Sequence, residues 1–244
     1  MTSNIIKFVH EDNIFEVKNP DPNETVLNYV RNKLKKTGTK ESCAEGGCGA
    51  CTIVLGELKN NKINYSAVNS CIMFLPTLHG KQLILVEDLV SKEGLLHPVQ
   101  KAMVNFHGSQ CGFCTPGFVM SLFSMYKNHY KFDDQLSRDT IAGNLCRCTG
   151  YQPIIKAAKS LNNKNKFDHF NKNKQNIINL LKKIKNESIA IYSKGKNYFA
   201  PLYVQELKKI LKKNAESHLL SGGTDLSLLV TKERKEINSI IYMN

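Results

Sequence analysis

The chain has 244 residues, of which 41% are hydrophobic, and a formal net charge of +13. This length suffices for one large domain or two small ones, and no apolar run reaches the roughly 20 residues that a membrane-spanning helix needs. The first residues also lack the uninterrupted apolar core and the small-residue cleavage site of a secretory signal. We therefore expect a cytoplasmic protein that is not embedded in a membrane.

The positive charge is unevenly distributed along the chain. Residues 1–155 contain 16 Lys and Arg against 14 Asp and Glu, whereas residues 156–244 contain 18 against 7. Much of the excess lies in a Lys- and Asn-rich stretch, which we interpret as a solvated linker. Because no basic motif interleaved with aromatic residues and no helix-turn-helix pattern occurs, nucleic acid is not an expected partner.

Residues 1–90 predict a small mixed sheet packed on one helix. IIKFV and IFEV flank a polar turn at His10 to Asn13, as in a β-hairpin. A helix follows, with Asn23 or Thr25 as its cap, and its apolar residues recur at helical spacing: Val26, Leu27, Val30 and Leu34. After a Gly- and Cys-rich loop over residues 41–51, strands return at TIVLGEL, INYSAV and QLILV. This order of elements is that of a β-grasp, ferredoxin-like fold.

Residues 91–160 predict a compact unit of four helices. The helical segments are HPVQKAMVNF, PGFVMSLFSMY, SRDTIAGNL and YQPIIKAAKSL, and prolines stand near several first turns, where they are tolerated. Residues 161–188 form the Lys- and Asn-rich linker, partly helical at IINLLKKIK. Residues 189–244 then predict an amphipathic helix over Leu202–Leu211, a strand and a Gly-rich turn. The predicted fold class is therefore α+β.

The eight cysteines fall into two groups of four. The first group has the C-x4-C-x2-C spacing, with a distant fourth member, of plant-type 2Fe-2S ferredoxins: Cys43, Cys48, Cys51 and Cys71. The second group consists of two close pairs: Cys111 with Cys114, and Cys146 with Cys148. In the first loop, Gly46, Gly47 and Gly49 permit backbone conformations that turn successive amides toward an anionic cluster. One-electron transfer is the implied function.

Other roles of the cysteines compete with iron–sulfur ligation. Disulfides are not expected without a secretory signal, because cytosolic thiols are kept reduced. A catalytic role is not expected either, because eight cysteines in two groups of four look like metal ligands and not like one nucleophile with a base. Structural zinc stays open for the second group, since C-x2-C pairs are typical zinc ligands. Two clusters in series are the more economical interpretation, because the second group accompanies a plant-type loop.

Three segments, EGGCGACT, QCGFCTPGF and GNLCRCTGY, resemble the small, iron–sulfur and FAD subunit of bacterial xanthine dehydrogenases, in the xanthine oxidase family of molybdenum hydroxylases. The similarity covers nearly all of residues 1–160. The EGG run favours xanthine dehydrogenase over carbon monoxide dehydrogenase, and aldehyde oxidase is the less favoured relative. The resemblance implies oxidation of hypoxanthine or xanthine to urate at a molybdopterin on a partner chain, the large subunit, with electrons passing through two 2Fe-2S clusters to FAD and NAD.

The resemblance also implies the sites. The second cysteine group would face the molybdopterin, with Gln110 and Cys148 closest to it, and the first group would face the flavin. The segment LLSGGTDL would form the loop over the FAD diphosphate, where glycine amides suit an anion. This loop comprises Leu219, Leu220, Ser221, Gly222, Gly223, Thr224, Asp225 and Leu226. An ordinary Gly turn is the alternative interpretation of the same segment.

In relatives the flavin domain continues well beyond this loop, so the resemblance implies an incomplete FAD domain over residues 189–244 and a C-terminally truncated chain. We expect the apolar faces of Leu219–Val230 and Ile237–Tyr242 to be exposed, disordered or covered by a second chain that completes the domain. We also expect that the chain alone neither retains FAD nor hydroxylates xanthine. The alternatives are a stand-alone ferredoxin-like electron carrier and an inactive truncated product. No catalytic residue is predicted.

Overall fold

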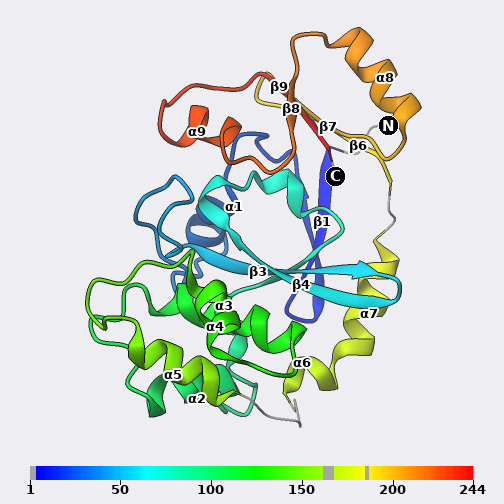
Figure 1. Cartoon of the computed structure of the whole chain (residues 1–244). Coiled ribbons are helices and arrows are strands. Elements are labelled where there is room, and N and C mark those ends of the chain that lie inside the picture. Colours follow the sequence, from blue (N-terminus) through cyan, green and yellow to red (C-terminus); the bar gives the residue numbers. More distant parts are fainter. Residues whose placement is uncertain (1–3, 162–167, 185–186, 244) are drawn as a thin grey trace.

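The computed structural model describes residues 4–161, 168–184 and 187–243. These residues form a five-stranded sheet in the order β2-β1-β5-β3-β4 and a four-stranded sheet in the order β6-β7-β9-β8. The five-stranded sheet lies at the centre of the molecule, with a group of helices below it and the second sheet above it (Figure 1). Its strands are β1 (Ile5–His10), β2 (Asn13–Lys18), β3 (Thr52–Lys59), β4 (Lys62–Asn69) and β5 (Gln82–Ile84).

The first strands confirm the predicted hairpin, because β1 and β2 pair antiparallel from Ile5 with Lys18 to His10 with Asn13. The helix that follows is α1 (Val26–Asn28), continued by a π-helical turn (Tyr29–Lys33). Thr25 is its cap, since the Thr25 hydroxyl accepts the Asn28 N–H at 3.2 Å. Short 3-10 helices precede and follow β5, at Ser70–Ile72, Leu75–Leu78 and Val86–Leu89. The predicted β-grasp order is therefore confirmed.

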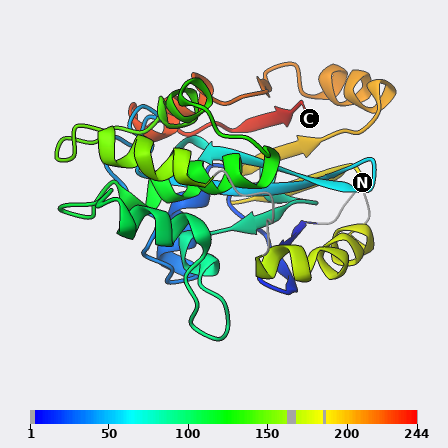
Figure 2. The same cartoon turned by 60° about the horizontal axis from the view of Figure 1, so that its bottom comes forward.

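The predicted four-helix unit is also present, as α2 (Pro98–Asn105), α3 (Thr115–Asn128), α4 (Asp134–Ile141) and α5 (Gln152–Ser160). The sequence placed the third of these helices too late, over SRDTIAGNL. It begins earlier because the Asp133 carboxylate accepts the Leu136 N–H at 2.8 Å and caps the first turn. It ends before Asn144, which is buried against another part of the chain. Figure 2 shows these helices grouped on one side of the central sheet.

The interpretation of residues 161–188 as a solvated linker is wrong for the residues from 168 to 184. They form α6 (His169–Lys172) and α7 (Lys174–Lys183), whose apolar side chains join the core of the helical unit and the central sheet. The buried residues are Phe170, Ile177, Ile178, Leu181 and Ile184. Most of the remaining positions are Lys and Asn. The helix predicted at IINLLKKIK is confirmed by α7, and its apolar face packs on the core instead of lying in solvent. Residues 162–167 and 185–186 of the predicted linker lie outside the described residues.

The C-terminal region is a folded α/β module. It comprises β6 (Ile189–Ser193), β7 (Lys196–Ala200), α8 (Val204–Lys213), β8 (His218–Leu220), α9 (Leu226–Thr231) and β9 (Ser239–Tyr242). One face of its sheet shares a core with Ile6 and Phe8 of the central sheet. The expectation that Ile237–Tyr242 would be exposed is therefore wrong: Ile237, Ile240 and Ile241 are buried. For Leu219–Val230 the expectation holds at Leu219, which is 55% exposed, but Leu220 is buried and Leu226, Leu229 and Val230 pack against the same core.

Polar contacts fasten this module to the first domain, and among them are those of the buried residues Asn23 and Ser227. The Asn23 side chain donates to the Ile237 carbonyl at 3.1 Å and accepts the Ile237 N–H at 2.8 Å. The Ser227 hydroxyl donates to the Ile72 carbonyl at 2.6 Å. Because these groups would otherwise be buried without partners, both contacts fix where the module sits.

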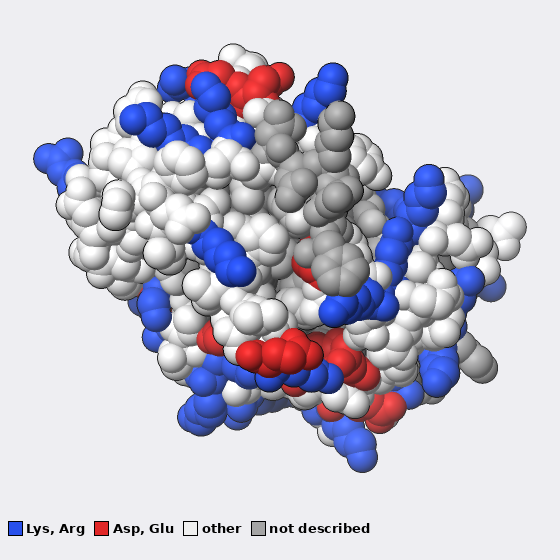
Figure 3. Space-filling view, turned by 90° about the horizontal axis from the view of Figure 1, so that it is seen from below, with Lys and Arg blue, Asp and Glu red and all other residues white. Residues whose placement is uncertain are grey.

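Basic and acidic side chains differ in how they are distributed on one face of the molecule. Seen from below, Lys and Arg are spread over the face and Asp and Glu gather in a band across it (Figure 3). No helix in the described part of the chain is both long and apolar enough to cross a membrane.

Candidate metal centres

The register of two strands brings the first cysteine group together. Cys51 directly precedes β3, Cys71 follows β4, and the pair Thr52 with Asn69 holds the two ends side by side. Cys51 and Cys71 are buried, whereas Cys43 and Cys48 are half-buried in the loop. The distant fourth member predicted from the spacing is therefore a neighbour of the loop in space.

Left-handed backbone at three positions shapes this loop. Ala44, Gly46 and Gly49 have φ values of 56°, 77° and 70°, a region that favours glycine. Gly47 does not have left-handed backbone, so that part of the prediction is wrong for Gly47, but its amide does donate to the Cys43 sulfur as predicted. The Glu45 N–H donates to the Cys43 sulfur at 3.5 Å. The loop thus turns an amide toward a sulfur, as an anionic centre requires.

The second cysteine group lies at the surface of the helical unit. Cys111 is in the loop before α3, Cys114 stands at the start of α3, and the other two follow α4. The sulfurs of Cys111 and Cys148 are 3.6 Å apart, and both residues are exposed. Cys114 and Cys146 are half-buried. One side of this group therefore faces outward and the other faces the protein.

The thiols of both groups interact in pairs. In the first group, a hydrogen bond from Cys71 lowers the pKa of Cys51 to about 7, and the same bond raises the pKa of Cys71. Cys43 and Cys48 form the other pair of that group. In the second group, burial and a hydrogen bond with Cys146 raise the pKa of Cys114 to about 12. Each group thus consists of two thiol pairs.

This pairing distinguishes two irons from one zinc. In a tetrahedral zinc site with Zn–S bonds near 2.3 Å, all four sulfurs lie within about 3.8 Å of one another. Among the described residues, the groups of three or more ligand atoms that all lie within 4.8 Å of one another include no cysteine. A 2Fe-2S cluster takes two thiolates on each iron, so its sulfurs lie in two separated pairs. Both groups therefore fit a 2Fe-2S cluster better than zinc.

The two groups touch through the backbone. The Leu145 N–H, one residue before Cys146, donates to the Cys48 carbonyl at 2.9 Å. The buried Asn144 side chain donates to the Gly49 carbonyl at 3.0 Å and accepts the Ser121 hydroxyl at 2.7 Å. The sequence analysis missed Asn144 and Leu145, whose only signal was their position directly before the CRC segment. They place the second group against the loop of the first.

The loop expected to bind FAD lies beside the first group. Residues 221–224 line a cavity of about 340 Å³ together with Asn69 and Ile72, the residue after Cys71. Gly223 has a φ of 83°, so this position requires glycine. Leu220 and Leu226 pack inward, and Asp225 precedes α9. Gln110 is exposed next to Cys111.

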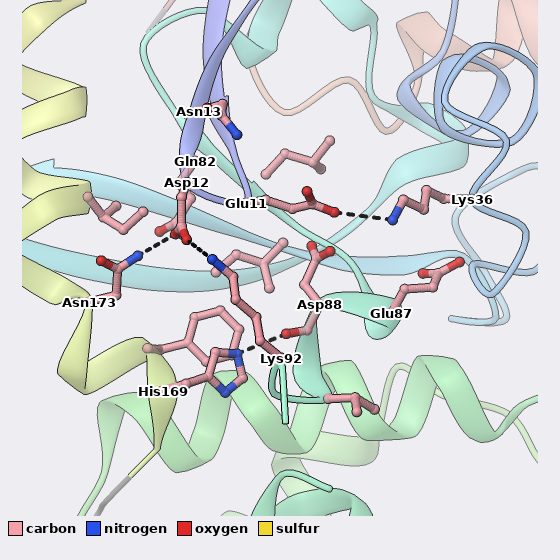
Figure 4. A pocket seen from close by; sticks show the side chains of 15 residues that line it. Glu11, Asp12, Asn13, Lys36, Gln82, Glu87, Asp88, Lys92, His169 and Asn173 are labelled. Carbon is pink, nitrogen blue, oxygen red and sulfur yellow. Dashed lines mark hydrogen bonds and ion pairs between the residues drawn. The ribbon is translucent and has the colours of Figure 1, made fainter. Parts of the chain in front are cut away.

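A separate cavity of about 290 Å³ lies between the first hairpin, the 3-10 helix Val86–Leu89 and α6–α7 (Figure 4). Glu11 and Asp88 line it, and their carboxylates form with His10 a group of three possible ligand atoms within 4.8 Å of one another. Glu11 is paired with Lys36 at 3.2 Å, and the Asp88 carboxylate accepts the Leu85 N–H at 2.8 Å. Burial raises the pKa of Asp88 to about 6. Both carboxylates already have partners within the protein. We therefore interpret the cavity as a packing gap between α6–α7 and the central sheet and not as a metal site.

Comparisons with known proteins bear on the two cysteine groups. A family described as a 2Fe-2S iron-sulfur cluster binding domain matches residues 9–75, and one described as a 2Fe-2S binding domain matches residues 85–159. Xanthine dehydrogenase of Drosophila pseudoobscura pseudoobscura is 44% identical over 161 residues, which are 65% of this chain and 12% of that protein. Aldehyde oxidase 4 of Mus musculus is 41% identical over 162 residues, which are 66% of this chain and 12% of that protein.

A solved structure is similar in fold to most of this chain. Quinoline 2-oxidoreductase of Pseudomonas putida 86 matches with a TM-score of 0.55 and 26% identity, over 73% of this chain and 96% of that chain. This chain carries the two-domain 2Fe-2S region of the xanthine dehydrogenase and aldehyde oxidase family. Each of the two matched domains is of a 2Fe-2S-binding type, so the cofactors of this region are two 2Fe-2S clusters. The chain spans about 12% of the length of the curated relatives it matches.

Proposed function

We propose that this chain carries electrons through two 2Fe-2S clusters within a molybdenum hydroxylase of the xanthine dehydrogenase type. The observation that supports this most strongly is the pairing of the thiols in both cysteine groups. Each cluster, when bound, supplies one-electron redox chemistry. The protein holds the two sites in contact and sets their surroundings.

The proposed ligands are the eight cysteines. In the first site, Cys43 and Cys48 hold one iron, and Cys51 and Cys71 hold the other. In the second site, the two pairs are Cys111 with Cys148 and Cys114 with Cys146. The sulfurs of the first site are buried or half-buried, and a backbone N–H donates to one of them. Such amide donors stabilise the negative charge that four thiolates bring to a cluster.

The contact between Cys48 and Leu145 supports electron transfer between the sites. It joins a proposed ligand of the first site to the residue before Cys146, a proposed ligand of the second, through a single hydrogen bond of 2.9 Å. Asn144 holds this contact in place by fixing its own segment to the Gly49 carbonyl. This contact keeps the two sites close together, which favours electron transfer between them.

The exposed side of the second site supports a protein partner. Cys111 and Cys148 are exposed, and the neighbouring Phe113 and Leu145 are 47% and 58% exposed. An apolar rim around a redox site fits a protein surface that completes it. We propose that this surface meets a molybdopterin-binding large subunit or domain, with Gln110 at the contact.

We propose hypoxanthine or xanthine as the substrate of the assembled enzyme. This proposal rests on the EGG run of the first loop and on the xanthine dehydrogenases among the relatives. The test uses the assembled enzyme, purified through this chain. Xanthine should reduce both clusters, which electron paramagnetic resonance detects, and the isolated chain should not oxidise xanthine. Reduction by aldehydes but not by xanthine would assign the chain to an aldehyde oxidase, and a chain that purifies without a molybdenum protein would support a stand-alone carrier.

Metal content gives a direct prediction. Anaerobically isolated chain should hold about four iron and about four acid-labile sulfide, because each cluster contains two of each. Cys48→Ser should remove only the signal of the first cluster, and Cys114→Ser only that of the second. Iron and sulfide assays with visible spectra measure this. Zinc in place of iron at either group would contradict the ligand proposal.

We also propose that residues 219–226 are the diphosphate-binding part of a FAD site, next to the first cluster. Residues 220–224 of this loop line a cavity of about 340 Å³, near the lower limit of sites for small ligands, and the preceding Leu219 is exposed. A dinucleotide would therefore be only partly covered, and the isolated chain should lose FAD on desalting. Flavin fluorescence of the desalted protein checks this, and one bound FAD per chain would contradict it.

A further inference from the structure

One hydroxyl group lies against a sulfur of the second site. Thr149 Oγ1 is 3.2 Å from the Cys146 sulfur, and the Thr149 N–H donates to the same sulfur at 3.5 Å. Oγ1 also accepts the Tyr151 N–H at 3.2 Å. With a lone pair of Oγ1 engaged by Tyr151, the hydroxyl proton is free to point at the sulfur. A metal-bound thiolate has no proton, so the hydroxyl must then be the donor.

The turn around Thr149 is built to hold this position. Gly150 and Tyr151 both have left-handed backbone, with φ values of 65° and 67°. A bulky residue adopts that conformation only where its surroundings impose it. Here the Tyr151 hydroxyl accepts the Cys146 N–H at 2.9 Å, and the Tyr151 ring packs edge-on against Phe118 at 6.1 Å. The strained turn therefore closes back onto Cys146 and sets the direction of the Thr149 side chain.

We propose that the Thr149 hydroxyl is a positioning group that raises the reduction potential of the second cluster by donating a hydrogen bond to the Cys146 thiolate. This inference rests on the proposed function, in which Cys146 is a cluster ligand. Reduction adds a negative charge to the cluster, and a donor to a ligand sulfur stabilises the more negative state more strongly. The hydroxyl lies on the Cys114–Cys146 side, which faces the protein and not the exposed Cys111–Cys148 side.

The test compares three variants by redox titration, with electron paramagnetic resonance to read each cluster separately. Thr149→Val keeps the shape of the side chain and removes the donor, so the midpoint potential of the second cluster should become more negative. Thr149→Ser keeps the hydroxyl and should restore the wild-type value. The matched control is Thr115→Val, one residue from Cys114, because the hydrogen bond of the Thr115 hydroxyl in the described residues is to the Ser109 hydroxyl, at 2.8 Å. The first cluster serves as the internal reference in every sample.

The outcomes separate the inference from the function on which it rests. An unchanged second-cluster potential in Thr149→Val, with both clusters present, would overturn the role of the hydroxyl. Loss of the second cluster from Thr149→Val would overturn it as well, because the hydroxyl would then be needed for assembly. A wild-type protein without two reducible clusters would instead contradict the proposed function.

Discussion

Gly117→Ala should lower the melting temperature of the cluster-loaded chain by about 5–10 °C. Gly117 lies in α3, and a Cβ atom there would stand 2.2 Å from the Gly49 carbonyl oxygen and 3.1 Å from Asn144 Nδ2. Because the first of these atoms is backbone, the helix must move away from the first cysteine loop. Overpacking of this kind costs about 1–3 kcal/mol or more, and each kcal/mol lowers the melting temperature of a chain this size by about 2–4 °C.

Gly143→Ala is the matched control for this prediction. Gly143 lies in the same contact region, but a Cβ atom there meets nothing within 4 Å and its backbone is not left-handed. Its melting temperature should equal that of the wild type, as followed by visible circular dichroism of the clusters. Equal melting temperatures for Gly117→Ala and Gly143→Ala would show that the close approach of α3 to the loop is not needed for stability.

Asp168→Asn should lower the free energy of unfolding by about 3–5 kcal/mol, since it leaves a buried charge without its partner. Asp168 and Lys127 are buried, and both carboxylate oxygens lie 3.1 Å from the Lys127 ammonium. His97 completes a buried cluster with these two residues, and its Nε2 is 3.2 Å from the Asp168 carboxylate. His97 Nδ1 accepts the Val99 N–H, so Nε2 carries the proton and donates it to Asp168.

The same cluster predicts an acid dependence. Burial opposes the charge of Asp168, but hydrogen bonds from His97 and the nearby Lys127 outweigh it and lower its pKa to about 2, from an ordinary 3.8. A lowered acid pKa stabilises the fold above the unfolded pKa, and this stabilisation is lost as the pH falls toward the folded value. The difference in melting temperature between wild type and Asp168→Asn should therefore narrow between about pH 5 and about pH 3.

Asp134→Asn provides the comparison, because Asp134 is paired with Arg138 at 2.5 Å and Lys159 at 3.1 Å on the surface. Exposed pairs of this kind contribute little, so its melting curve should follow that of the wild type. If Asp168→Asn also melted like the wild type at neutral pH, the buried cluster would not hold α6 to the helical unit.

Local pattern was sufficient to predict most of the first 160 residues. The hairpin, the Thr25 cap and the four helices follow from alternation, capping residues and helical spacing. The cysteine groups were visible because metal ligands leave a spacing in the sequence. Local signals failed where a polar side chain acts through a distant partner, and Asn144 and Asp168 are the examples, with partners 95 and 71 positions away.

The C-terminal module shows the same limit for apolar residues. The apolar residues of Ile237–Tyr242 predict a strand. The surface that covers this strand could not be predicted from the same residues. That surface is formed by strands more than 200 positions earlier in the sequence, including Ile6 and Phe8. The sequence analysis therefore left the strand exposed. The roles of the FAD loop and of Gln110 stay predictions. The structure gives the positions of these residues but not the cofactors that they would bind.

The shared core of the two sheets has a consequence for how the protein is made. Phe8 and Leu83 are synthesised early, yet the residues that cover them include Ile237 and Ile240. At about 5–20 residues per second, a ribosome needs on the order of 10–50 s to pass from the first of these positions to the last. During that interval the face of the nascent central sheet is open to chaperones and to aggregation. Iron loading of the first loop therefore takes place on an unfinished core if it precedes the synthesis of Ile237 and Ile240.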